Sequence, residues 1–188
     1  MTPAGAPLPD LTAPRDLVIA SGRAFCDWPT LFAAAHPSRW RLLVICGAHD
    51  RDLVERLNAG GRATVIADVA PERVHELLRE AAVSVLPMYE AGVSQGHLRL
   101  CDAIDAGAVV VASRTRSLEG YVEDGRTAVL VPAGDAAALK AAIDRLLGDG
   151  AERERLARAA FERAGSWTWA DYLAAVEAFG RGTAPAGP

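Results

Sequence analysis

Six short apolar runs, alternating with stretches that have a helical pattern, constrain the fold of this chain more than any other feature. The runs are LVIAS (17–21), RLLVICG (41–47), ATVIA (63–67), VSVLP (83–87), AVVVAS (108–113) and TAVLVP (127–132). Strands that are apolar on both faces and alternate with helices are typical of a parallel sheet covered on both sides, with right-handed crossovers. The pattern therefore predicts an α/β domain with a doubly wound, six-stranded parallel sheet of Rossmann-like type.

The chain after the sixth run has three helical patterns and no further strand. They are DAAALKAAIDRLLGDG, which Asp135 can cap, AERERLARAAFERAG and TWADYLAAVEAF. We therefore expect C-terminal helices over residues 134–180, packed on the same domain as the sheet of residues 16–133. The Pro-, Ala- and Gly-rich ends, 1–15 and 181–188, have no hydrophobic period and are predicted to be flexible.

Composition limits the classes of protein to which the chain can belong. It has 188 residues, of which 51% are hydrophobic and 23% charged, and a net charge of −4, with Lys and Arg scattered. These values favour one soluble domain that does not bind nucleic acid.

No apolar run has the length of a membrane span and MTPAGAPLPDLTAP lacks signal-peptide features, so we expect a cytoplasmic protein. Cys26, Cys46 and Cys101 form no CxxC pair and are interpreted as small buried residues.

A ligand site is predicted where the chain reverses its direction of growth across the sheet. In the strand order 3-2-1-4-5-6, a crevice opens at the carboxyl ends of strands 1 and 4. SGRAFCD (21–27) follows the first strand and PMYEAGVSQGHLRLCDAIDAG (87–107) follows the fourth. A Gly-Arg pair and a glycine-spaced helix entry therefore form the two lips of one crevice.

These lips carry groups that suit a phosphate between two sugars. Gly92 and Gly96 allow a tight turn before a helix that starts within 94–98, and the free N–H groups of a helix start bind anions. Arg23 can reach the same anion from the opposite lip. Glu90 and Asp102 can accept hydrogen bonds from sugar hydroxyls, which predicts a nucleotide-sugar pocket. The alternative is that these are ordinary turn glycines and surface charges.

Two other polar features fit more than one role. His97 lies in the predicted pocket, where it is either a phosphate donor or base, or a cap or partly buried polar residue. HDRD (49–52) groups a histidine with acidic residues, and we interpret it as the start of a helix. No metal ion is therefore expected.

The order of segments from Leu17 to Phe179 resembles the C-terminal, donor-binding half of GT-B glycosyltransferases, in particular the family-4-like retaining enzymes. CDAIDAGAVVVAS is similar to the family's E-A-M-A-x-G-x-P-V-V-A-S, and GYVEDGRTAVLVPAGDAAAL to its E-x-V-x-D-G-x-T-G-x-L-V-P-x-G-D. SGRAFCDWPTL resembles the opening G-R segment, and LREAAVSVLPMYEAG the approach to the acidic loop. The resemblance covers nearly the whole chain.

The resemblance implies a metal-independent hexosyltransferase site without a cofactor, in which a nucleotide-diphosphate sugar is the donor substrate. Glu90 would contact the sugar, Asp102 the ribose, and Arg23 with backbone amides the departing diphosphate. The implied catalytic residues are Glu90 and Arg23; the implied donor-binding residues are Gly22, Arg23, Ser94, Gln95, Gly96, His97, Leu98 and Asp102. The chain departs from the family in three ways. Its two carboxylates are further apart in the sequence, and the second is Asp102 rather than the longer glutamate. Cys26 or a neighbour stands where relatives have a second basic residue.

The resemblance leaves more than one function open. The family's N-terminal acceptor half has no counterpart here, so a partner chain would supply it; alternatively, the chain is a degenerate, non-catalytic scaffold or regulatory module. A sugar-nucleotide epimerase is disfavoured because no G-x-G-x-x-G follows the first strand. In relatives the last helix crosses to the other half, so its apolar residues would here contact a partner subunit or a second copy, or fold back on the domain. They are Trp167, Trp169, Tyr172, Leu173, Val176 and Phe179.

Overall fold

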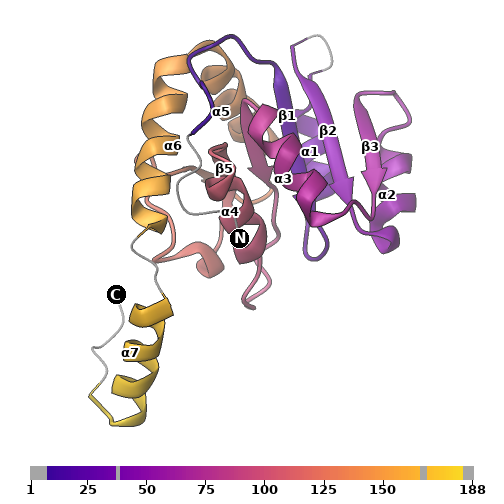
Figure 1. Ribbon diagram of the computed structural model, residues 1–188. Helices are drawn as coiled ribbons and strands as arrows, with labels where there is room; N and C mark the ends of the chain where they lie inside the picture. The colour runs from indigo at the N-terminus through magenta and orange to yellow at the C-terminus, as the bar shows by residue number, and fades with distance from the viewer. Residues whose placement is uncertain (1–7, 37–38, 166–168, 184–188) are drawn as a thin grey trace.

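The computed structural model describes residues 8–36, 39–165 and 169–183. Its sheet has six strands: β1 (Leu17–Gly22), β2 (Arg41–Cys46), β3 (Ala63–Ala67), β4 (Val83–Leu86), β5 (Val109–Arg114) and β6 (Val129–Pro132). All neighbouring strands are parallel, in the order β3-β2-β1-β4-β5-β6. This confirms the predicted fold class and strand order (Figure 1).

The sixth strand is shorter than the apolar run that predicts it. The run TAVLVP begins at Thr127, whereas β6 begins at Val129. Thr127 closes a turn instead, because its N–H donates to the Glu123 carbonyl at 2.9 Å and its hydroxyl accepts from the Glu123 N–H at 2.8 Å. A threonine hydroxyl that satisfies the backbone of a turn competes with strand pairing.

Helices occupy the stretches with helical patterns. They are α1 (Trp28–Ala34), α2 (Arg51–Leu57), α3 (Pro71–Glu80), α4 (His97–Asp105), α5 (Ala136–Gly148), α6 (Gly150–Ala164) and α7 (Trp169–Gly180), with short 3-10 turns η1 (Ala48–Asp50) and η2 (Arg116–Leu118). Asp27 and Asp135 are N-caps, as predicted: each carboxylate accepts a backbone N–H from the first turn of its helix, that of Thr30 and that of Ala138.

The helices cover both faces of the sheet, because every central strand is apolar on both faces. One core cluster joins β1, β2, β4 and β5 to α1, α2 and α5, and two smaller clusters join the opposite face to α3 and α4. Helix α6 lies along the β5 side and touches both α4 and α5. A cavity lies between these layers at the C-terminal edge of β1 and β4.

A buried arginine joins the N-terminal segment to the C-terminal helices. Arg153 on α6 is 1% exposed and donates to the carbonyls of Leu11, Ala13, Leu146 and Leu147 at 2.5–3.1 Å. Residues 11–13 are thus held on the domain, although the composition of residues 1–15 predicts a flexible segment. The part of that prediction that concerns residues 1–7 lies outside the described residues.

Helix α7 lies apart from the sheet and its covering helices in Figure 1, whereas α5 and α6 pack on them. Leu173, Val176 and Phe179 are exposed, the last by 79%. Trp167 and the side chains of Trp169 and Tyr172 lie outside the described part of the chain. The predicted contact of this helix with a partner or with its own domain stays a prediction.

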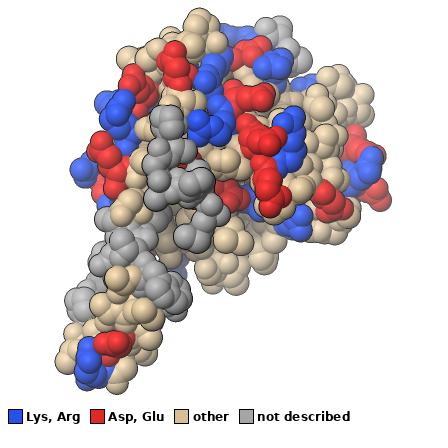
Figure 2. Space-filling view, viewed as in Figure 1, with Lys and Arg blue, Asp and Glu red and all other residues tan. Residues whose placement is uncertain are grey.

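The described residues form a surface of mixed charge. On the face that Figure 2 shows, basic and acidic side chains are interspersed over the helices rather than separated by sign. None of the helices in the described residues has both the length and the apolar character that a bilayer span requires.

Candidate functional site: a crevice between β1 and β4

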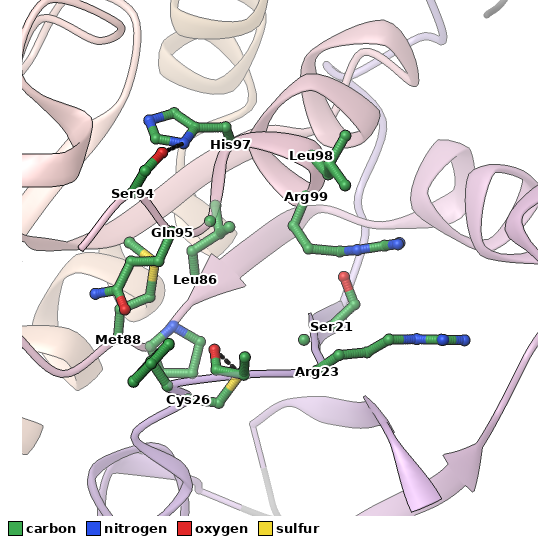
Figure 3. Close-up of a pocket in the computed structure, with 15 residues that line it drawn as sticks. Ser21, Arg23, Cys26, Leu86, Met88, Ser94, Gln95, His97, Leu98 and Arg99 are labelled. Atoms are coloured by element: carbon green, nitrogen blue, oxygen red, sulfur yellow. Dashed lines mark hydrogen bonds between the residues drawn. The ribbon is translucent and has the colours of Figure 1, made fainter. Parts of the chain in front are cut away.

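A cavity of about 390 Å³ opens at the carboxyl ends of β1 and β4. Three segments line it: residues 21–26 after β1, residues 86–88 at the end of β4, and residues 94–99 at the start of α4 (Figure 3). Seven of the nine residues predicted to bind or act on a ligand line this cavity; Glu90 and Asp102 do not. The strand order therefore brings together the two lips that the sequence predicted.

Backbone hydrogen bonds connect the two lips of the crevice. The Asp27 N–H donates to the Pro87 carbonyl at 2.7 Å, and the Tyr89 N–H donates to the Phe25 carbonyl at 3.0 Å. Gly22 is required for this close approach, since a Cβ there would lie 2.1 Å from the Cys26 sulfur. Burial, with a smaller contribution from Asp50, raises the pKa of Cys26 to about 12, so that its thiol stays neutral.

The start of α4 provides an anion-binding backbone on the second lip. Gly96 precedes the helix in the left-handed region, at φ +82°, and a Cβ there would lie 2.5 Å from the Met88 sulfur. The first intrahelical bond runs from the Leu100 N–H to the Gly96 carbonyl at 2.9 Å. The N–H groups of residues 97–99 precede that bond and have no partner within the helix, which is the arrangement that binds phosphate and carboxylate groups.

Two arginines lie in the crevice, one from each lip. The Arg23 and Arg99 side chains extend toward the same side of the cavity in Figure 3, with Ser21 between them. Within the described residues, Arg23 makes no hydrogen bond or ion pair, whereas Arg99 Nη1 lies 2.9 Å from Asp102 Oδ2. Sequence reasoning missed Arg99. Because Arg99 lies one helical turn before Asp102, the sequence indicates that the two share a face of the helix. Only the fold shows that this face of α4 borders the crevice.

The two predicted carboxylates are already engaged within the protein. Asp102 pairs with Arg99, its side chain is 42% exposed, and it lines neither this cavity nor its two neighbours. Glu90 accepts the Arg116 N–H at 2.8 Å and the Gly92 N–H at 3.1 Å. These two hydrogen bonds, chiefly the one from Arg116, hold the pKa of Glu90 below its ordinary value.

Two further cavities continue the crevice in opposite directions. One, of about 250 Å³, shares Arg23 and Arg99 with the central cavity and extends to apolar residues of β2, α3 and the loop before α3. The other, of about 470 Å³, shares Ser94 and His97 and extends to Glu90 and Arg116. The three cavities thus follow the C-terminal edge of the sheet, with the arginines between an apolar end and a polar end.

His97 connects α4 to the polar end of this row. Its Nδ1 lies 3.1 Å from the Ser94 hydroxyl and its Nε2 lies 2.6 Å from the Ser117 carbonyl. Because a carbonyl only accepts, Nε2 carries the proton that donates to it. The ring also lies against Tyr121, with centroids 4.3 Å apart. His97 therefore braces the loop, while its backbone N–H belongs to the helix start.

The HDRD segment extends from η1 into α2. Its histidine and first aspartate lie near one another, with His49 Nε2 3.7 Å from Asp50 Oδ2, and Asp50 accepts the Trp28 indole N–H at 2.9 Å. In the parts of the chain that the structure describes, no group of three or more His, Cys, Asp or Glu side chains is arranged to hold a metal ion.

The sheet order defines a Rossmann-like domain of the GT-B type, and comparison with known proteins agrees with this fold. Residues 26–149 match the family model of glycosyl transferases group 1. The chain belongs to this family, and its resemblance to GT-B glycosyltransferases is confirmed.

Individual relatives are longer than this chain. It is 29% identical over 143 residues to the D-inositol 3-phosphate glycosyltransferase of Corynebacterium diphtheriae, a match that covers 71% of this chain and 33% of that protein. Sucrose-phosphate synthase from Thermosynechococcus elongatus is 28% identical, with a TM-score of 0.74 over 89% of this chain and 45% of that one. Anabaena HepE in complex with UDP-glucose is 20% identical, with a TM-score of 0.69 over 82% of this chain and 45% of that one.

Proposed function

We propose that this chain binds a nucleotide-diphosphate sugar as the donor half of a glycosyltransferase. The observation that carries the proposal is the convergence of Arg23 and Arg99 with the N–H groups of residues 97–99 on one cavity. Cationic and amide donors that face one another across a crevice suit a diphosphate. HepE, a fold neighbour, was solved with UDP-glucose, which supports this class of ligand.

The row of cavities suggests how the donor lies. The apolar end next to β2 and α3 would hold the base, the arginines the diphosphate, and the sugar would lie on the opposite side of the central cavity, toward the polar end near Glu90. As the bond between sugar and diphosphate breaks, negative charge grows on the leaving diphosphate. Preorganised arginine and N–H donors stabilise that charge more than they stabilise the ground state, and they do so without a metal ion. The acceptor side would come from outside the residues that form this crevice.

A second candidate function is a non-catalytic, scaffold-like or regulatory module with the same fold. The observation that favours it is the state of the two carboxylates. Glu90 is occupied by two backbone N–H groups and Asp102 by Arg99, as is typical of residues that hold a loop and a helix in place. In this alternative the crevice would bind no nucleotide sugar.

Calorimetric titration with UDP, GDP, ADP and their glucose and mannose esters separates the two. The donor-half proposal predicts micromolar affinity for one base. Replacing Arg23 by glutamine should then weaken binding by about 10- to 100-fold, because a charge-assisted contact is lost. Arg158→Gln is the matched control: Arg158 is an exposed arginine on α6, paired with Glu154, and it lines none of the three cavities. Absence of binding at millimolar ligand would favour the scaffold.

A further inference from the structure

One buried polar atom in the wall of the crevice has no partner. Gln95 is 7% exposed and lines the central cavity. Its Nε2 donates to the Tyr89 carbonyl at 2.5 Å, whereas its Oε1 has no hydrogen-bond partner among the described residues. Such buried, unsatisfied oxygens are uncommon in folded proteins and call for an explanation.

The orientation of this amide follows from its surroundings. The group that faces the Tyr89 carbonyl has to be the NH₂ group, since two carbonyl oxygens do not hydrogen-bond each other. Tyr89 is itself fixed, because its N–H donates to the Phe25 carbonyl on the opposite lip at 3.0 Å. The amide therefore cannot turn to satisfy its oxygen without losing its bond to Tyr89. The Gln95 side chain therefore offers a ligand an acceptor, because its donor group is already used.

The position of Gln95 limits which group of a ligand could donate a hydrogen bond to its Oε1. In Figure 3 Gln95 lies on the side of the central cavity away from Arg23 and Arg99. It lines neither the apolar cavity beyond the arginines nor the polar cavity, which begins at its chain neighbour Ser94. A phosphate oxygen accepts hydrogen bonds and would not pair with Oε1. A hydroxyl group donates, and in a nucleotide-diphosphate sugar the hydroxyls on the far side of the diphosphate from the base belong to the sugar.

We infer that Gln95 Oε1 accepts a hydrogen bond from a hydroxyl group of the donor sugar and so contributes to the recognition of that sugar. The inference rests on the proposed function and gives Gln95, one of the predicted donor-binding residues, the specific role of distinguishing a nucleotide sugar from the bare nucleotide. Met88, which packs against Gly96 in the wall of the same cavity, is unbranched and adaptable, and its movement would admit the hydroxyl to this covered oxygen.

The test compares affinities for the nucleoside diphosphate that the chain binds, UDP, GDP or ADP, and for its glucose and mannose esters. Gln95→Met keeps the length of the side chain and removes the acceptor together with the Nε2 donor to the Tyr89 carbonyl. Because loss of the Tyr89 bond weakens both ligands alike, the readout is the difference between them: we expect affinity for the sugar ester to fall about three- to tenfold more than affinity for the bare diphosphate, the usual effect of one hydrogen bond. A purely structural role would weaken both ligands by the same factor, which would overturn the inference.

A second measurement on the unsubstituted chain does not depend on how the variant folds. Among the monodeoxy analogues of the bound sugar ester, one should bind about three- to tenfold more weakly than the parent. The Gln95→Met protein should not discriminate between that analogue and the parent. If every deoxy analogue binds as tightly as the parent, the inference is wrong although the diphosphate still binds. If no nucleoside diphosphate binds at all, the proposed function fails and the inference fails with it.

Discussion

Arginine side chains lie among backbone groups in two regions of the molecule, and their hydrogen-bonding capacity is used to different degrees in the two. Between the N-terminal segment and α5–α6, Arg153 is buried and donates to four carbonyls. In the crevice, Arg23 makes no hydrogen bond or ion pair within the described chain, Arg99 has one ion pair, and the Gln95 oxygen is unsatisfied. In the first region the arginine finds its hydrogen-bond acceptors within the protein, and these bonds stabilise the fold. The second retains unused hydrogen-bonding capacity of the kind that a ligand fills.

Removing Arg153 should have the largest effect on stability. Arg153→Met would leave the carbonyls of Leu11, Ala13, Leu146 and Leu147 without their donor. We expect the free energy of unfolding to fall by about 3–4 kcal/mol, because bonds from a charged donor are lost and buried acceptors stay unpaired. Urea unfolding measures this loss. Ligand affinity of the folded variant should be unchanged, and a loss below about 1 kcal/mol would contradict the distinction between the two regions.

Gly96→Ala should combine a stability loss with a binding loss. An alanine at φ +82° is strained, and its Cβ would lie 2.5 Å from the Met88 sulfur. Because the Met88 side chain is flexible and can yield, most of the expected destabilisation of about 1–2 kcal/mol comes from the left-handed backbone, and a shift at the start of α4 should weaken diphosphate binding.

Gly61→Ala is the matched control for this substitution. Gly61 has a similar φ of +64°, but its Cβ would meet nothing within 4 Å, so it tests backbone strain alone at about 1 kcal/mol. Thermal unfolding and calorimetry together make the comparison. Equal effects of the two substitutions would show that the contact with Met88 is unimportant.

Arg99→Gln should weaken diphosphate binding about tenfold with little change in stability, since it removes one cation from the crevice. If Asp102 acts by orienting Arg99, Asp102→Asn should have a smaller effect, and the two substitutions together should lose no more than Arg99→Gln alone. Additive losses in this double-mutant cycle would instead support the predicted contact between Asp102 and the ribose.

The smallest expected effect concerns Glu90. Its pKa is lowered in the folded protein by the N–H groups of Arg116 and Gly92, so the stability that it contributes is present above its unfolded pKa and is lost as the pH falls through its folded pKa. Glu90→Gln should therefore lower the melting temperature slightly at about pH 7 and hardly at all at about pH 3. A difference from the unsubstituted chain that is the same at both pH values would contradict this account.

The sequence by itself determined the sheet and the place of the crevice. The run VSVLP becomes β4 because a segment that is apolar on both faces is stable only between two layers, and the strand order then brings Arg23 and the start of α4 together. Asp27 and Asp135 cap their helices because a cap depends on residues only three positions apart.

Only the tertiary structure decided which polar groups face that crevice and which are already satisfied. Arg99 borders the crevice and pairs with Asp102, and Glu90 accepts the N–H of Arg116. The Gln95 amide donates to the carbonyl of Tyr89, and its oxygen has no partner among the described residues. Each outcome depends on the direction of a side chain or on a backbone group from another element. Periodicity and local spacing reveal neither, because hydrogen-bond partners distant in sequence are set by packing.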